Sequence, residues 1–490
     1  MKAIISRVYQ KLPSPLSYKF WLLLAFCIKA LFFILKLTLA CAPPQHYQAA
    51  LVGYDGGDAS SYIEPIENYI ANGVYFDDYR MPGYGALYYL LRLFLVQEWA
   101  LNALIILQVL LSAVSVYVLG LVALKTFRKQ VMFYLVFFLY GISTYVSIYD
   151  IALLTESLCV SSLIFSVFFL LSAGKRDLFI SGFFLTWCVF LKPAMFPLFI
   201  LFAGYLLVKD RKITWNILQY NWSRVFIFLL CFATLDGIWI LRNYEKYDRI
   251  IPLTKSRYYT EFETSFMKPL FVFMNSFGGS IVFWEPGSEI TFFLPLGDFV
   301  KKKVDVELPQ EIYTSTFNRD SLLRIKEMIR LSVSDTISDF RKAEIEKELS
   351  SRLTLYANSI REERPYLYYI GSRIRVMKSF FVHSGTYNLF LKASFELNKA
   401  ELLIKIFYSL LYVFVILFGF AGSLLLLFKG MRKPEYFLMA GIALYVALAF
   451  PLILKLDEYR YLVPGYPFLL LASAYLTLGF YAYFSPVIRK

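Results

Sequence analysis

Long apolar runs constrain the fold of this chain more than any other feature. About ten stretches have the length and composition of membrane spans: residues 20–40, 100–123, 131–149, 156–173, 178–191, 194–208, 224–241, 403–428, 435–454 and 461–484. A helix needs roughly 20 apolar residues to cross a bilayer about 30 Å thick. Since 58% of the residues are hydrophobic and only 18% are charged, we expect an all-α polytopic membrane protein.

Two of these regions leave alternatives open. The first span follows a basic N-terminal stretch, as in a signal peptide, but Lys29 and Lys36 interrupt it and it is long for a signal-peptide core, so we expect it to be retained. The stretches at 178–191 and 194–208 are short, so these two helices either tilt, thin the bilayer or fail to cross it fully.

Basic residues collect in the short loops between spans and predict the orientation. They occur at the N-terminus and in the segments 125–129, 175–176, 209–212, 429–433 and 489–490, all on one side of the predicted bundle. By the positive-inside rule this side is cytoplasmic, which also accounts for the net charge of +14 without nucleic-acid binding. The chain then divides into a transmembrane module over 1–241 with a first outer loop at about 41–99, an extracytoplasmic region over 242–402, and C-terminal transmembrane helices over 403–490.

Within the predicted outer region, residues 318–360 have apolar positions at helical spacing, including Leu322, Ile325 and Ile329, and are expected to form helix. The five cysteines show no C-x-x-C spacing, and only two histidines occur, so the sequence predicts neither a disulfide framework nor a multi-histidine metal site. No glycine-rich nucleotide-binding motif is present.

Ionisable residues from six chain segments fall at the predicted outer ends of the spans. They are Asp55, Asp58, Arg80, Asp150, Glu156, Lys192, Arg242, Asp457, Glu458 and Arg460. Charged groups at membrane depth are costly unless partnered, so a gathering of them predicts a water-filled site that faces outward.

Each of these residues also has an ordinary structural explanation. Asp58 has the position and residue type of an N-cap for a helix that begins at residue 59. Glu156 has Lys192 as a potential ion-pair partner, and Lys192 and Arg242 are placed to extend along a helix end to the interface. Glu458 and Arg460 could form a surface ion pair with one another. The sequence leaves these alternatives open.

A set of short motifs carries a family resemblance. The motifs are Asp58-Ala59-Ser60-Ser61-Tyr62, Ala71-Asn72-Gly73, Arg80-Met81-Pro82-Gly83-Tyr84, Leu153-Leu154-Thr155-Glu156, Leu191-Lys192-Pro193, Trp239-Ile240-Leu241-Arg242-Asn243-Tyr244 and Glu458-Tyr459-Arg460-Tyr461. Their order and side resemble the GT-C superfamily of membrane glycosyltransferases, particularly protein O-mannosyltransferases, ArnT-like lipid A aminoarabinose transferases and RgtA-like enzymes. The resemblance covers roughly 20–250 and 403–484. Some branches have two adjacent acids in the first outer loop, whereas here Gly56 and Gly57 separate Asp55 from Asp58.

The resemblance implies an inverting glycosyltransferase that moves a sugar from a polyprenyl-phosphate donor to an acceptor hydroxyl on the extracytoplasmic side of a bacterial inner (plasma) membrane. It implies Asp58 as the base and Glu156 as a second catalytic carboxylate or as a supporting residue that orients the site. The implied donor-phosphate contacts are Arg80, Lys192, Arg242 and Arg460, and the implied substrate contacts are Tyr62, Tyr84 and Glu458. A divalent metal ion bound through Asp55 and Asp58 stays open, and the acceptor could be a lipid, a glycan or a protein.

Two other functions fit parts of the pattern. An O-antigen ligase or polymerase would suit the large outer loop that comes late in the chain, whereas the Asp58 loop directly after the first span suits it less. A lipid or glycan transporter (flippase) would have a similar number of spans and charges at membrane depth, but such folds often show repeated halves and broken helices. The sequence shows neither feature clearly.

Overall fold

A computed structural model describes residues 13–39, 58–75, 80–172, 174–209, 215–254, 266–282, 287–294, 306–334, 337–383 and 397–484. The part of the chain that it describes is helical and contains no β-strand, which confirms the predicted all-α class. Helices dominate because each one satisfies its backbone hydrogen bonds internally, as the interior of a bilayer requires.

The chain divides into two compact units. The first comprises residues 1–254, 384–445 and 462–490, and the second comprises residues 255–383 and 446–461. Each unit has its own packing and is described by itself below.

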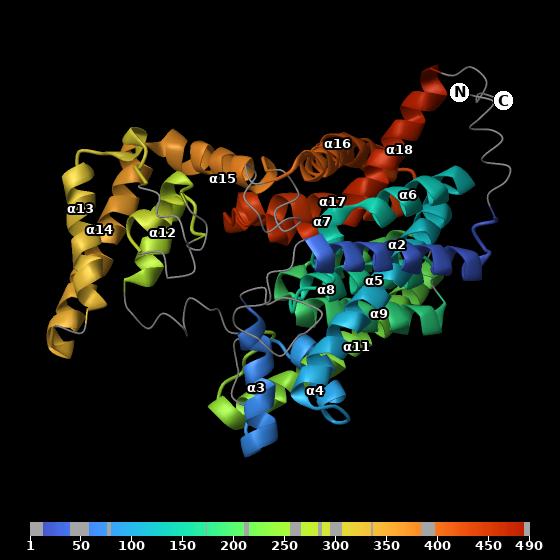
Figure 1. The fold of residues 1–490 in the computed structure, drawn as a ribbon, viewed down its shortest axis with the longest axis horizontal. Coiled ribbons are helices and arrows are strands. Elements are labelled where there is room, and N and C mark those ends of the chain that lie inside the picture. The colour runs from blue at the N-terminus through green and yellow to red at the C-terminus, as the bar shows by residue number, and fades with distance from the viewer. Residues whose placement is uncertain are drawn as a thin grey trace. The chain divides into compact units, whose positions relative to one another are not determined.

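The first unit contains most of the apolar helices. They are α2 (Tyr18–Leu39), α3 (Ala59–Asn72), α4 (Gly83–Arg92), α5 (Gln97–Phe127), α6 (Gln130–Ile142), α7 (Thr144–Ser147), α8 (Glu156–Ser172), α9 (Lys175–Leu191), η1 (Pro193–Met195), α10 (Leu198–Val208), α11 (Trp215–Tyr247), α16 (Lys399–Gly430), α17 (Pro434–Leu448) and α18 (Tyr466–Phe484). Helix α5 packs against α2, α6 and α8, and α9 packs between α8 and α11 (Figure 1).

Six helical segments in the described part of the chain are long and apolar enough to cross a membrane. They are Tyr18–Leu35, Gln97–Phe127, Asn221–Tyr247, Lys399–Gly430, Pro434–Leu454 and Tyr459–Tyr481, and they support the predicted integral membrane protein. Shorter apolar helices occupy Gln130–Ile142, Glu156–Ser172 and Pro193–Val208. The helix expected over 131–149 is interrupted, because Ser143 is extended between α6 and α7. The count of about ten spans stays a prediction.

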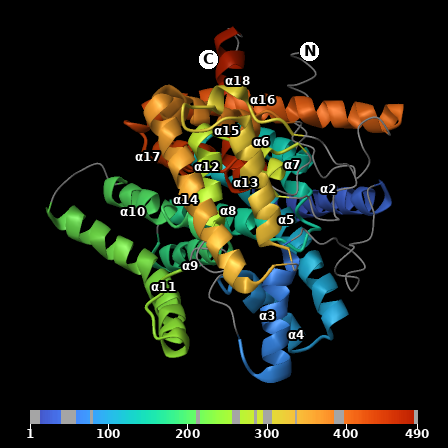
Figure 2. The same ribbon diagram turned by 90° about the vertical axis from the view of Figure 1, so that its left-hand side faces the viewer.

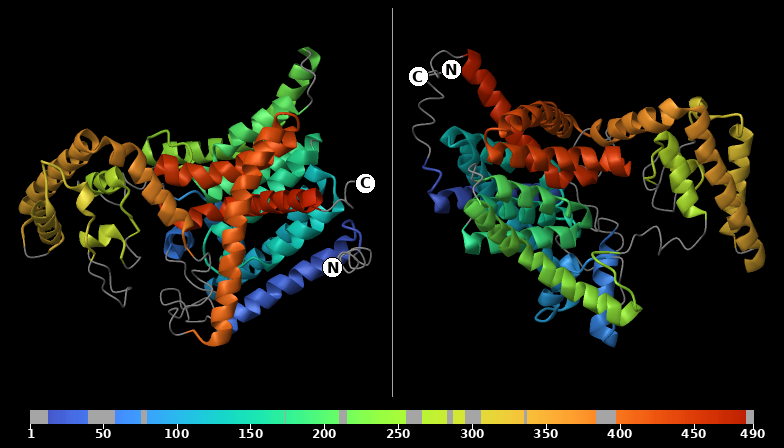
Figure 3. Two further views of the ribbon diagram at one scale, coloured as in Figure 1. Left: turned by 90° about the horizontal axis from the view of Figure 1, so that it is seen from above. Right: turned by 180° about the vertical axis from the view of Figure 1, so that it is seen from behind.

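Helices α16 and α18 cross in close contact (Figure 3, left, orange and red). A Cβ atom at Gly422 would lie 2.2 Å from the carbonyl oxygen of Ala472, and one at Gly419 would lie 2.8 Å from that of Leu469. Only glycine leaves room for backbones at this separation, and small residues at helix interfaces are a common device in membranes.

The second unit is a smaller helical body with its own apolar core. It contains α12 (Met267–Phe277), η3 (Glu289–Phe292), η4 (Gln310–Ile312), α13 (Arg319–Ser332), α14 (Asp339–Glu363), η5 (Leu367–Gly371), α15 (Ser372–Phe381) and η7 (Ala449–Leu454), and η8 (Tyr459–Gly465) begins in it. Helices α13 and α14 lie side by side (Figure 2). The helix expected over 318–360 is therefore confirmed as helical but divided in two, because Asn318 and Ser338 each cap a separate N-terminus. Leu322, Ile325 and Ile329 are buried as expected.

Candidate functional site

An ion pair between Asp58 and Arg80 links α3 to the turn before α4. The Arg80 guanidinium donates to Asp58 Oδ1 at 3.0 Å, to Ser61 Oγ at 2.9 Å and to the Tyr62 hydroxyl at 2.9 Å. Asp58 occupies the N-cap position of α3, but its side chain makes no capping hydrogen bond. The carboxylate is therefore directed to Arg80, and it keeps 17% of its side chain exposed to solvent.

A second and more deeply buried ion pair joins the start of α8 to the end of α9. Lys192 Nζ donates to Glu156 Oε1 at 2.7 Å, and the exposed fractions of the two side chains are 9% and 2%. The pairing that the sequence left open between these two residues is present. The second carboxylate oxygen, Glu156 Oε2, is buried and has no hydrogen-bond partner in the described part of the chain. A buried acceptor without a partner is unusual and calls for an explanation such as a ligand or a water molecule.

Two tyrosines bring the ion pairs into one cluster. The rings of Tyr62 and Tyr84 lie 5.2 Å apart, and the charges of Arg80, Glu156 and Lys192 all act on the Tyr62 phenol. Burial raises the pKa of Tyr62, while Arg80 acts in the opposite direction, and burial raises the pKa of Tyr84 well above its usual value. Both phenols are therefore neutral. We call Asp58, Tyr62, Arg80, Tyr84, Glu156 and Lys192 the charged cluster.

The turn that carries Arg80 is held against α9 by close backbone packing. A Cβ atom at Gly83 would lie 2.7 Å from the carbonyl carbon and oxygen of Phe190, which precedes Lys192 by two residues. Met81 packs in the same small core as Phe190 and Trp239. Glycine at this position thus lets the start of α4 reach the backbone that positions Lys192.

Within the charged cluster, Tyr84 is held by a hydrogen bond to a buried glutamine. The Tyr84 hydroxyl donates to Gln108 Oε1 at 3.0 Å, and Gln108 Nε2 donates to the carbonyl oxygens of Asp150 at 3.0 Å and Ala152 at 2.8 Å. Tyr84 is completely buried, and its ring packs against that of Tyr62. Its contact with a substrate stays a prediction.

A buried lysine that the sequence analysis treated only as an interruption completes this network. Lys29 Nζ contacts Asp150 Oδ2 at 2.9 Å, and the Asp150 carboxylate also accepts from Ser112 at 2.8 Å and Ser157 at 2.6 Å. The sequence does contain a signal for this ion pair, namely a lysine within an apolar helix, because such a residue usually has a partner of opposite charge. The ion pair of Lys29 and Asp150 stabilises the turn between α7 and α8. This turn leads directly to Glu156.

Arg242 lies near the end of α11 and contacts backbone and aromatic rings. Its guanidinium donates to the Tyr75 carbonyl oxygen at 2.7 Å and to Asn243 Oδ1 at 2.7 Å, and it lies 4.8 Å from the ring centre of Trp239. Arg242 is connected to the charged cluster indirectly: Trp239 packs with Met81, which is the residue after Arg80.

The remaining predicted site residues belong to the second unit or lie outside the described residues. Glu458 and Arg460 belong to the second unit and form an ion pair with one another, and both side chains are mostly buried rather than at the surface. Their contact with a donor phosphate or substrate stays a prediction. Asp55 lies outside the described residues. Among the residues that the structure describes, no group of three or more His, Cys, Asp or Glu side chains could hold a metal ion. A metal site that includes Asp55 therefore stays a prediction.

Comparison with known proteins adds no relative: no family model, no curated protein and no solved structure matches the chain significantly. The fold and the apolar helices thus define the broad class, an all-helical integral membrane protein, and the function has to be argued from the charged cluster.

Proposed function

We propose that the chain is an inverting glycosyltransferase that moves a sugar from a polyprenyl-phosphate donor to an acceptor hydroxyl on the extracytoplasmic side of the membrane. The observation that carries the proposal is the charged cluster itself. Four chain segments contribute two carboxylates and two cations within one group, together with neutral phenols. The proposal also accords with the motif order that resembles GT-C enzymes.

The reaction needs positive charge where the phosphate leaves. As the bond between the anomeric carbon and the phosphate oxygen breaks, both electrons stay with the phosphate, and fixed cations stabilise this developing charge. Arg80 and Lys192 supply these cations in the cluster. Arginine binds a phosphate through two parallel hydrogen bonds, and lysine acts as a point charge.

The reaction also needs a carboxylate that takes the proton of the attacking hydroxyl. The acceptor oxygen forms the new bond to the anomeric carbon from the face opposite the phosphate, and its proton passes to a base within hydrogen-bond reach. Asp58 is the better base, because it is partly exposed and an acceptor can reach it. Glu156 is almost completely buried, and its role is to position Lys192.

Matched variants test these roles. Asp58→Asn keeps the shape but removes the base, so it should abolish transfer while donor binding persists. Lys192→Met removes a phosphate contact and should weaken donor binding. Glu327→Gln is the control, since Glu327 forms an exposed ion pair on α13 outside the cluster. Full transfer activity in Asp58→Asn would refute the assignment of the base.

A transporter is the second candidate, and the buried pair of Lys29 and Asp150 favours it. Lys29 lies in the candidate span Tyr18–Leu35, and ionisable residues within such spans often mark pathways for ions or substrates. If the chain is a transporter, Asp150→Asn should abolish substrate movement across sealed vesicles, and no glycosylated product should form with any donor. Formation of a product that depends on Asp58 would exclude this candidate.

A further inference from the structure

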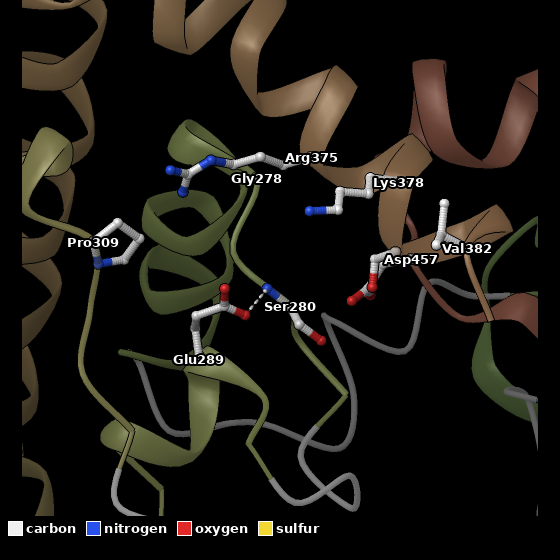
Figure 4. A pocket seen from close by; sticks show the side chains of 9 residues that line it. Gly278, Ser280, Glu289, Pro309, Arg375, Lys378, Val382 and Asp457 are labelled. Carbon is white, nitrogen blue, oxygen red and sulfur yellow. Dashed lines mark hydrogen bonds between the residues drawn. The ribbon is translucent and has the colours of Figure 1, made fainter.

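The second unit contains a pocket with charged side chains in its lining that plays no part in the proposed transfer reaction. Its volume is about 390 Å³, and it is lined by side chains from the stretch after α12, from η3 and α15, and from the turn after η7. Figure 4 shows Glu289, Lys378 and Asp457 directed toward a common space. The pocket therefore places acidic and basic groups opposite one another.

The acidic side of the pocket consists of Asp457 and Glu289. Asp457 is buried, with 6% of its surface exposed, and Glu289 Oε2 accepts the backbone N–H of Ser280 at 2.9 Å. Burial raises the pKa of Asp457, and the negative charge of Glu289 acts in the same direction. A cationic group placed between these carboxylates would relieve both effects.

The basic side consists of Arg375 and Lys378, one turn apart on α15. Arg375 forms an ion pair with Glu311, and this pair occupies some of the N–H donors of the Arg375 guanidinium. The Lys378 side chain is exposed, and its ammonium group lies between Arg375 and Asp457 in Figure 4. These two side chains can bind an anion next to the acidic side.

The pocket lies where a predicted membrane span ends. Residues 449–454 form the last part of the span Pro434–Leu454, and Asp457 follows three residues later. Helix α15 packs against this end of the span, since Arg373 Nε donates to the Leu452 carbonyl oxygen at 3.2 Å. Because a span ends at the bilayer surface, the end of this candidate span predicts lipid head groups at the level of the pocket.

Apolar side chains beside the pocket are exposed to the surroundings. Ile374, Val382 and Ile453 are 55%, 73% and 76% exposed, respectively. Val382 also lines the pocket. A ligand with a charged head and an apolar tail would cover both kinds of surface, as basic and apolar side chains do together at membrane interfaces.

We infer that this pocket binds the head group of an aminophospholipid such as phosphatidylethanolamine. The primary ammonium group donates to Asp457 and Glu289, and the phosphate accepts from Lys378 and Arg375. The acyl chains follow the apolar surface of Ile374, Val382 and Ile453. The inference concerns binding alone and does not depend on the proposed transfer reaction.

Binding of chain-labelled lipids to the purified full-length protein in detergent micelles tests the inference. Labelled phosphatidylethanolamine should bind more tightly than phosphatidylcholine, which has no N–H donor, and than phosphatidylglycerol, which has no ammonium. Loss of a charge-assisted hydrogen bond is worth about tenfold or more in affinity, so Asp457→Asn and Lys378→Ala should each weaken phosphatidylethanolamine binding about tenfold.

Lys347→Ala is the matched control, because Lys347 is an exposed lysine on α14 that does not line the pocket. Lys378 is itself exposed, so its variant should keep the fold and remains informative if Asp457→Asn does not fold. Equal binding of the three lipids, or an affinity unchanged by Lys378→Ala, would overturn the inference. Competition by glycerophosphoethanolamine at the same concentration as the lipid would instead assign the pocket to a soluble ligand.

Discussion

Replacement of Gly83 by alanine gives a sharp test of how the charged cluster is built. The new Cβ atom would lie 2.7 Å from the carbonyl carbon and oxygen of Phe190 and 2.9 Å from the backbone nitrogen of Leu191. These are backbone atoms in the last turn of α9, so they cannot move aside as the end of a flexible side chain would. Either α4 or the end of α9 has to shift.

The size of the effect follows from two opposing contributions. Overpacking of this kind costs about 1–3 kcal/mol, and contact with backbone places Gly83→Ala near the upper end. The change from glycine to alanine gains at most about 1 kcal/mol inside a helix, and less at the first residue of α4. We therefore expect the free energy of unfolding to fall by about 2 kcal/mol. Transfer activity should fall strongly as well, because the shift of α4 relative to α9 separates Arg80 from Lys192.

Thermal unfolding of the purified protein measures the loss of stability, and a transfer assay measures the loss of activity. Gly204→Ala in α10 is the matched control, since its Cβ atom would meet nothing within 4 Å. That variant should be as stable as the wild type or slightly more stable. If Gly83→Ala unfolds at the same temperature as Gly204→Ala and keeps full activity, the proposed packing of α4 on α9 is wrong.

Two further predictions concern buried charge. Lys29→Met leaves the Asp150 carboxylate buried without its cation and should lower the free energy of unfolding by about 3 kcal/mol. The double variant Lys29→Met with Asp150→Leu removes both charges and should recover much of this loss. Equal unfolding midpoints for the single and double variants would contradict the pairing. Burial lowers the pKa of His383 from 6.5 to about 4. Between these values the unfolded state binds more protons, so stability should fall as the pH drops from 6.5 to 4, and His383→Gln should flatten this part of the profile. An unchanged profile in His383→Gln would show that other groups cause the acid loss.

Much of the charged cluster could be predicted from residue order and type. Asp58, Arg80, Glu156 and Lys192 were expected to gather because charged groups at span ends need partners or water. The structure joins them in two ion pairs, and the charges of both pairs act on the Tyr62 phenol. The all-helical class followed from the apolar runs for a similar reason, since backbone groups in lipid must bond within their own helix.

The remaining features depend on contacts between distant positions. Lys29 and Asp150 are 121 residues apart in the sequence, so neither neighbourhood reveals the other. Gly83 gives no sign in the sequence that it touches Phe190, because that contact depends on how α4 meets α9. The break at Ser143 also escaped prediction, although Gly141, Ser143 and Thr144 are weak helix formers, because the apolar run continues on both sides of them.

Transfer of sugar from defined donors tests the central claim most directly. Purified wild-type protein and Asp58→Asn would be incubated with a panel of radiolabelled polyprenyl-phosphate sugars and an extract that contains candidate acceptors. The account predicts that at least one donor gives a labelled product with the wild type and none with Asp58→Asn. Absence of a product with every donor, or equal product from both proteins, would contradict it.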